Sequence, residues 1–228
     1  MTITTTTLTR AAGLAAVAGG LLFIAVQFKH PLLTPEFTTT TEYAVRETAK
    51  ILMAVLSLVG ITGIYLRKVR QVGVLGLIGY LLLSVGYLTI LTIQVIAVFV
   101  LPDLAASQPG YVSDALAVAH SGHPVGDVSQ FQTLTNIAIT YIAGGIIFGI
   151  ALFRAGILAR WAAALMTLGA VATIATFQLP ELTQRLFAIP AAIALIGLGY
   201  SLWRDQRTQA VRVPPSTDSP QLDPAGAR

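Results

Sequence analysis

The hydrophobic positions of the chain form long continuous runs, not an alternating pattern. Six runs approach or exceed the roughly 20 apolar residues that a helix needs to cross the hydrocarbon core of a bilayer. They cover residues 11–28, 49–66, 72–101, 137–153, 161–179 and 186–203. Because backbone polar groups in lipid must hydrogen-bond within the protein, such runs predict transmembrane helices. The pattern therefore predicts an all-α, polytopic transmembrane helix bundle with six spans.

The composition of the 228 residues agrees with this fold class. Hydrophobic residues make up 55% of the chain and charged residues 11%, whereas about 25% of the residues in soluble domains are charged. This composition excludes a disordered or collagen-like chain. The absence of cysteine excludes a disulfide scaffold, a thiolate nucleophile, an iron–sulfur cluster and covalently attached haem.

The basic residues predict how the helices are oriented, since Lys and Arg of short loops stay on the cytoplasmic side. With the N-terminus inside, four of them fall on the outer side: Lys29, Arg46, Lys50 and Arg185. The other ten fall on the inner side: Arg10, Arg67, Lys68, Arg70, Arg154, Arg160, Arg204, Arg207, Arg212 and Arg228. We therefore expect a multi-pass protein of the bacterial cytoplasmic membrane with both termini in the cytoplasm. The net charge of +4 reflects this topology, and no basic stripe with stacking aromatics predicts a nucleic acid partner.

The runs divide the chain into three parts. Residues 1–10 form a cytoplasmic leader, residues 11–203 the six-helix transmembrane domain, and residues 204–228 a disordered cytoplasmic tail that is rich in proline. Two long loops, at 29–48 and 102–136, lie on the outer side. They carry most of the acidic residues and all three histidines, so we expect any small-molecule function on that side.

Polar side chains recur at helical spacing in two stripes. The stripes consist of Tyr80, Ser84, Tyr87 and Gln94, and of Ser129, Thr133, Asn136 and Thr140. Polar groups in a membrane face the bundle interior or water, which predicts an outward-opening polar crevice between the second, third and fourth helices. The alternative is that these groups only hold the helices together. In both cases small residues predict lines of close contact between helices, which we call packing seams. They lie at Gly145 and Gly149, and at Gly73, Gly76 and Gly79.

The helix of the second run carries charges before it enters the membrane. Glu42, Arg46 and Lys50 are spaced i, i+4, i+8, which allows ion pairs on one face. If Lys50 lies at the edge of the hydrocarbon, leaving its charge unpaired is costly. Its expected partner is Glu47 or an acid of another outer loop. We expect five side chains to line the crevice and bind a ligand: Arg46, Lys50, Tyr87, Gln94 and Asn136.

The second outer loop contains the string His120-Ser-Gly-His123-Pro-Val-Gly-Asp127. Two imidazoles and a carboxylate could hold a divalent metal ion, with His30 or an acid as a further ligand. Histidines in a loop with Gly and Pro can equally be solvated, or respond to the external pH. No other cofactor is expected.

Three functions remain open. The first is a non-catalytic membrane protein, surrounded by lipids, whose crevice binds a small amphipathic molecule or supports a membrane partner protein. The second is a membrane-embedded enzyme that acts on a lipid or isoprenoid substrate through a desolvated carboxylic acid. Its candidate acids are Glu36, Glu42, Glu47, Asp103 and Asp127. The third is a small transporter, which a faint similarity between the helix ends at 63–67 and 149–154 favours.

Two strings, at residues 66–77 and 149–163, combine a helix end, a short basic turn and the start of the next helix. With these strings the chain resembles the small uncharacterised six-helix integral membrane proteins of actinobacteria. The resemblance implies a fold and a type of host only. It implies no functional residue.

Overall fold

The computed structural model describes residues 4–28, 33–121, 126–156, 158–176 and 181–212. Helix accounts for 89% of the structure, and the described residues contain no strand. This confirms the predicted all-α class. Three helical segments are long and apolar enough to cross a membrane, at Thr5–Ala25, Thr41–Phe99 and Ser129–Ala155.

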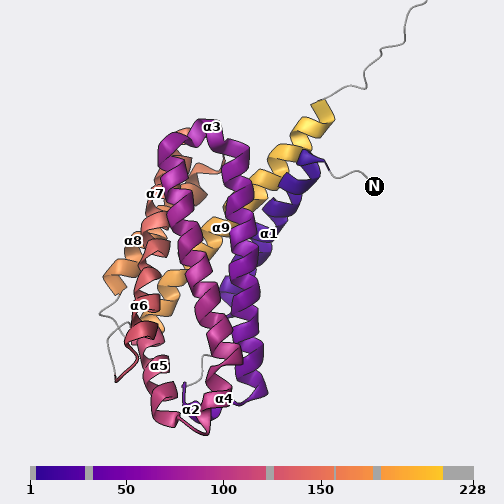
Figure 1. Cartoon of the computed structure of the whole chain (residues 1–228). Coiled ribbons are helices and arrows are strands. Elements are labelled where there is room, and N and C mark those ends of the chain that lie inside the picture. The colour runs from indigo at the N-terminus through magenta and orange to yellow at the C-terminus, as the bar shows by residue number, and fades with distance from the viewer. Residues whose placement is uncertain (1–3, 29–32, 122–125, 157, 177–180, 213–228) are drawn as a thin grey trace, which may run out of the picture.

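The helices follow one another with short connections. In chain order they are α1 (Thr5–Ala25), α2 (Pro35–Thr38), α3 (Thr41–Phe99), α4 (Leu101–Ala105), α5 (Pro109–Ser121), α6 (Ser129–Ile137), α7 (Ile139–Ala155), α8 (Arg160–Thr176) and α9 (Glu181–Arg212). Short helices gather where the sequence analysis predicted the outer loops. The long helices form the body of the molecule (Figure 1).

Helix α3 is folded back on itself at Gly73. A straight helix of 59 residues would be about 89 Å long, but Gly73 has φ 59° and ψ −156° and reverses the chain there (Figure 1). This region of φ and ψ is open essentially to glycine alone. We call residues 41–72 the first arm of α3 and residues 74–99 its second arm. Gly73 was predicted to be a packing residue, which is wrong, since a Cβ added to it would meet nothing within 4 Å.

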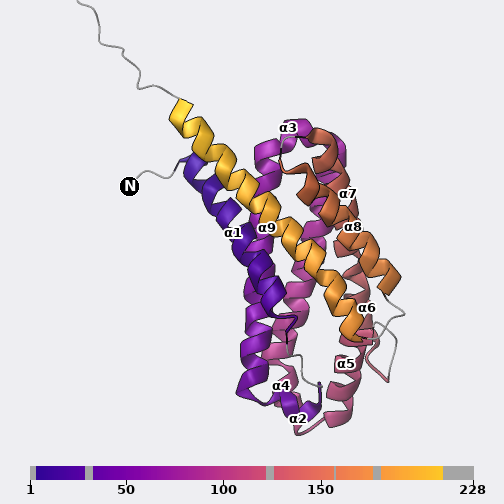
Figure 2. The same cartoon turned by 180° about the vertical axis from the view of Figure 1, so that it is seen from behind.

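The long helices form a closed ring. Helix α1 packs between the first arm of α3 and α9, the second arm of α3 packs on α7, and α8 joins α7 to α9 (Figures 1 and 2). Small residues let the backbones approach closely. A Cβ on Gly144 of α7 would overlap the backbone of Leu83 in the second arm. The predicted seam at Gly145 and Gly149 is confirmed, because both face α8.

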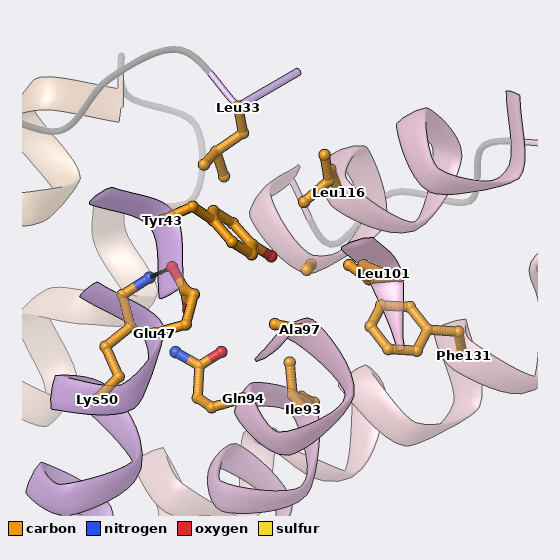
Figure 3. A pocket seen from close by; sticks show the side chains of 11 residues that line it. Leu33, Tyr43, Glu47, Lys50, Ile93, Gln94, Ala97, Leu101, Leu116 and Phe131 are labelled. Atoms are coloured by element: carbon orange, nitrogen blue, oxygen red, sulfur yellow. Dashed lines mark hydrogen bonds and ion pairs between the residues drawn. The ribbon is translucent and has the colours of Figure 1, made fainter. Parts of the chain in front are cut away.

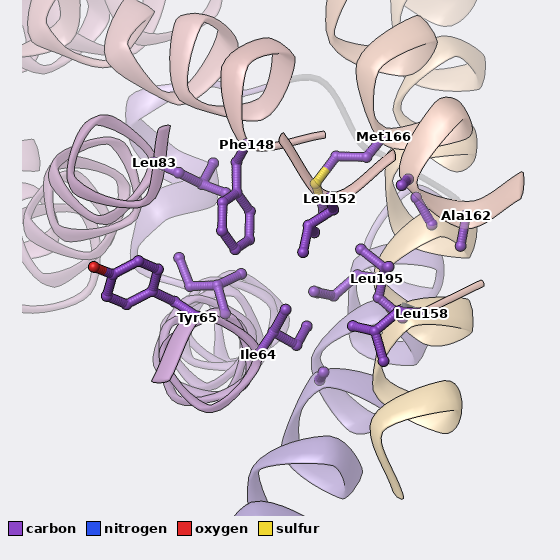
Figure 4. Packing of buried hydrophobic residues seen from close by; sticks show 14 of the residues in the cluster. Ile64, Tyr65, Leu83, Phe148, Leu152, Leu158, Ala162, Met166 and Leu195 are labelled. Atoms are coloured by element: carbon purple, nitrogen blue, oxygen red, sulfur yellow. The ribbon is translucent and has the colours of Figure 1, made fainter. Parts of the chain in front are cut away.

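The inside of the ring is filled by one apolar cluster over part of its length (Figure 4). Ile64 and Tyr65 come from the first arm, Phe148 and Leu152 from α7, and Leu195 from α9. Ile64 and Phe148 are completely buried. The cluster therefore holds the two sides of the ring together by burial of apolar surface.

The ring has two different ends. The start of α1, the reversal at Gly73 and the end of α9 lie together at one end, which we call the turn end (Figures 1 and 2). Helices α2, α4, α5 and α6 cover the opposite end, which we call the cap end. Arg67, Lys68 and Arg70 lie within the two helical turns before Gly73. The segments predicted to be inner and outer loops thus lie at opposite ends of the ring.

Three predicted boundaries differ from the structure. Helix α1 already begins at Thr5, within the predicted leader, because the Thr4 hydroxyl accepts a hydrogen bond from the Thr7 N–H and caps the helix. Helix α9 continues to Arg212, within the predicted tail, and the rest of that tail lies outside the described residues. The segments at 29–48 and 102–136 hold helices instead of long loops. Their own apolar residues, including Val112 and Phe131, form a second buried cluster that stabilises these helices.

Candidate functional site

A cavity of about 150 Å³ lies at the cap end, between the two arms of α3 and the short helices (Figure 3). Eleven residues line it: Leu33, Tyr43, Glu47, Lys50, Ile93, Gln94, Ala97, Leu101, Leu116, Ala119 and Phe131. Its walls come from both arms of α3 and from α4, α5 and α6. Of the two polar stripes that were predicted to line a crevice between the second, third and fourth helices, only Gln94 lines this cavity, which α4 and α5 help to enclose.

The polar side of the cavity is set by the start of α3. The Thr40 hydroxyl accepts a hydrogen bond from the Tyr43 N–H and fixes the first turn of the helix. Tyr43, Glu47 and Lys50 follow at i, i+4 and i+7, which places them on one helix face. Gln94 reaches the same space from the second arm (Figure 3).

Glu47 and Lys50 form a short ion pair at this face. The Lys50 ammonium donates to Glu47 Oε1 at 2.6 Å, as expected from their spacing in the sequence. The Glu47 side chain is only 5% exposed and that of Lys50 19%. Because a charge withdrawn from water is costly unless it is paired, each partner needs the other to lie here.

Several polar groups of the cavity retain unused hydrogen-bonding capacity. Neither the Tyr43 hydroxyl nor the Gln94 carboxamide bonds to another described residue, and the Tyr43 oxygen points into the cavity (Figure 3). An ammonium has three donor hydrogens, and Lys50 uses one of them on Glu47. The facing wall is apolar, with Leu101, Leu116 and Phe131 among its residues. The cavity therefore combines a donor-rich side with a hydrophobic side.

Of the five predicted ligand-binding residues, Lys50 and Gln94 line the cavity and three do not. Arg46 lies on a different face of α3, where it pairs with Glu42 at 2.8 Å and donates to the Phe28 carbonyl at 3.2 Å. Tyr87 is buried, with its ring edge-on to that of Tyr141 at 5.2 Å between centroids. Asn136 is exposed, and its carbonyl oxygen accepts a hydrogen bond from the Gln132 side chain at 2.9 Å.

Of the five predicted candidate acids, likewise, only one lies at the cavity. Glu47 lines the cavity, whereas the other four, Glu36, Glu42, Asp103 and Asp127, are exposed. The pKa of Glu36 is lowered by hydrogen bonds from its own backbone N–H and from the Thr34 hydroxyl. A carboxyl with a lowered pKa is a poor proton donor near neutral pH.

Most of the residues predicted to be metal ligands lie outside the residues that the structure describes. His30 and His123 lie outside the described residues, as does the side chain of His120. Asp127 is exposed in the turn before α6. Within the described ranges, no three His, Asp or Glu side chains come together in a way that could hold a metal ion.

The sequence analysis did not identify most of the lining residues. Tyr43 could have been found, because it shares the i, i+4, i+7 spacing with Glu47 and Lys50. Leu116 and Phe131 carried no such signal, since they come from a segment that was predicted to be a loop, and Leu101 was predicted only as the last residue of the third apolar run. Their place in the wall depends on how α4, α5 and α6 fold over the arms of α3.

No family model matches the chain, and no curated protein or solved structure matches it either. The resemblance to six-helix actinobacterial membrane proteins therefore stays a prediction. What the cavity does has to be inferred from its own geometry.

Proposed function

We propose that the chain crosses the bacterial cytoplasmic membrane six times, with both termini in the cytoplasm. Three described helices are long and apolar enough to span a membrane. The reversal at Gly73 supports two crossings by α3, since its arms extend about 48 Å and 39 Å. Helices α7, α8 and α9 supply the remaining crossings after α1. The basic residues near Gly73 favour a cytoplasmic turn end.

Cysteine accessibility tests this topology, because the chain has no cysteine of its own. Thr39, Ser107 and Gln71 are exposed positions suited to single substitutions by cysteine. A membrane-impermeant maleimide on intact cells should label Thr39→Cys and Ser107→Cys at the cap end. Gln71→Cys at the turn end should react only after the membrane is opened. The opposite pattern would reverse the orientation, and labelling of all three in intact cells would disprove the six-span topology.

We further propose that the cavity at the cap end binds a small amphipathic molecule without transforming it. The observation that carries this proposal is the convergence of the Tyr43 hydroxyl, the Gln94 carboxamide and the Lys50 ammonium on one cavity with an apolar wall. Polar groups that lack a protein partner are costly in a poorly hydrated space. A ligand that accepts their hydrogen bonds would remove this cost.

The size and charge of the cavity restrict the ligand. A volume of about 150 Å³ is close to that of an engineered apolar cavity that admits benzene. The site therefore suits a group of roughly six non-hydrogen atoms, either a whole small molecule or one end of a longer one. Because Glu47 and Lys50 neutralise each other, a neutral or zwitterionic group with hydrogen-bond acceptors fits best.

The enzyme alternative depends on Glu47, since the other four candidate acids are exposed away from the cavity. The Glu47 carboxylate is 2.6 Å from the Lys50 ammonium. A proton transfer through Glu47 would first have to break this pair. The geometry therefore favours binding over acid–base catalysis.

Native mass spectrometry of the protein released gently from its own membranes tests the binding proposal. Wild type should carry a reproducible small adduct, and metal analysis of the same sample reports on any bound ion. The adduct should be lost in Gln94→Leu and kept in Asn136→Leu. The second variant is the matched control, because Asn136 is an exposed amide outside the cavity. An adduct retained by both variants, or bulk phospholipid alone in all samples, would contradict the proposal.

A further inference from the structure

A second cavity lies at the turn end, at the opposite end of the ring from the first. Its volume is about 380 Å³. One side is formed by residues that flank the reversal of α3, among them Gln71, Val74 and Leu75. The other side is the last turn of α7, with Ala151 and Arg154. None of these residues belongs to the cavity at the cap end.

The polar part of this second cavity is cationic. Arg154 lines it, and Arg70 directly precedes the lining residue Gln71. Both arginines are exposed, and neither has an ion pair or hydrogen bond with another described residue. An arginine is always charged, and its planar fork of donors matches the oxygens of a phosphate group.

Other basic side chains at this end are engaged with the protein. The Lys68 ammonium bonds to Asp205 at 3.1 Å. The Arg160 guanidinium lies over the Phe153 ring, 5.7 Å from its centroid. Arg154 differs from these two because it lines the cavity and its charge is available to a ligand there.

The rest of the cavity is aliphatic and continues onto the outer surface of the ring. Val74 is 73% exposed and Leu75 38% exposed. Exposed aliphatic side chains on a membrane helix face the lipid chains. The cationic part and the aliphatic part are therefore adjacent, which is the arrangement of a lipid headgroup above its acyl chains.

We propose that this cavity binds an anionic phospholipid, with the headgroup phosphate held by Arg154, the arginine that lines it. The Gln71 carboxamide donates to an oxygen of the same headgroup, and the acyl chains lie along Val74 and Leu75. Basic pockets between transmembrane helices on the cytoplasmic side hold the headgroups of anionic lipids in this way. The turn end faces the cytoplasm in the topology proposed above, but the binding site itself does not depend on the ligand of the other cavity.

Native mass spectrometry of the full-length protein in detergent, titrated with defined lipid, tests this site. Wild type should retain phosphatidylglycerol, which is anionic, in preference to phosphatidylcholine, which is zwitterionic. Arg154→Gln should bind phosphatidylglycerol about tenfold more weakly, since it loses a hydrogen bond to a charged group. Arg160→Gln should bind like wild type, because Arg160 does not line the cavity. Gln71→Leu supplies a second weakened variant.

Three outcomes would overturn the proposal. The first is equal retention of the two lipids by wild type. The second is equal binding of phosphatidylglycerol by Arg154→Gln and Arg160→Gln, which would mean that the positive charge acts without a specific site. The third is stabilisation of wild type, but not of Arg154→Gln, by inorganic phosphate with no response to phosphatidylglycerol. In that case the site would recognise a free anion. Thermal unfolding of each variant without added lipid shows whether it is folded.

Discussion

The ammonium of Lys68, near the reversal of α3, lies 3.1 Å from the carboxylate of Asp205 near the end of α9. The Lys68 side chain is 7% exposed, whereas that of Asp205 is 32% exposed. The backbones of α3 and α9 lie close together at few positions, because α1 packs between them on one side of the ring. The pair therefore fixes the end of α9 against the turn end.

The unequal burial of this pair predicts unequal effects of its two substitutions. Asp205→Asn leaves the buried Lys68 charge without a counter-ion and should lower the free energy of unfolding by about 1–3 kcal/mol. Lys68→Met leaves Asp205 partly in water and should cost under about 1 kcal/mol. Thermal or denaturant unfolding in one detergent compares the variants. A larger loss for Lys68→Met would contradict this account.

The pair of Glu47 and Lys50 predicts strong coupling between two substitutions. Lys50→Met leaves the nearly buried Glu47 carboxylate unpaired and should destabilise the protein by about 2–4 kcal/mol. The double variant Glu47→Gln/Lys50→Met removes both charges and should recover at least half of that loss. Unfolding of the two single variants and the double variant gives the coupling energy. Additive losses would show that the two charges act independently.

Close packing of α7 on the second arm of α3 predicts that Gly144 tolerates no side chain. A Cβ there would overlap the backbone of Leu82 and Leu83, so Gly144→Ala should cost about 1–3 kcal/mol by overpacking. Gly110 is the matched control, as a helical glycine whose added Cβ meets nothing within 4 Å. Gly110→Ala should be neutral or slightly stabilising. Similar unfolding temperatures for both variants would be incompatible with the packing described.

The backbone conformation of Gly73 predicts that a substitution there destabilises the protein through backbone strain alone. Gly73→Asn should destabilise the protein by about 1–3 kcal/mol, since asparagine does not adopt φ 59° with ψ −156° without strain. Gly156 has a similar φ of 65° but a ψ of 17°, which asparagine tolerates. Gly156→Asn should therefore have little effect. The two unfolding curves, measured side by side, test whether ψ and not φ alone decides the outcome.

The sequence predicted those features that depend on the spacing of neighbouring residues or on the average hydrophobicity of long segments. Hydrophobic runs of membrane length predicted an all-helical protein, because helices satisfy their own backbone in lipid. The pair of Lys50 with Glu47 was predictable, since residues three apart on a helix are neighbours. Gly145 and Gly149 were identified as a packing seam because residues four apart lie on one face of a helix.

Features that depend on neighbouring helices could not be predicted in this way. Tyr87 and Gln94 share one stripe of the second arm, but Tyr87 is covered by Tyr141 of α7 whereas Gln94 faces the cavity. Asn136 was expected to meet them and is exposed instead. The basic residues before Gly73 suggested a loop at their own position, because such residues mark the membrane boundary. The helix continues through them and reverses only where glycine permits it.

The position of α1 between α3 and α9 has a consequence for how the protein is made. Helix α1 is synthesised before α9, yet Gly13 and Gly20 on one of its faces lie against the backbone of α9. This face therefore stays without its partner until α9 has been synthesised. Chains truncated before α9 would expose the interface to other proteins of the membrane.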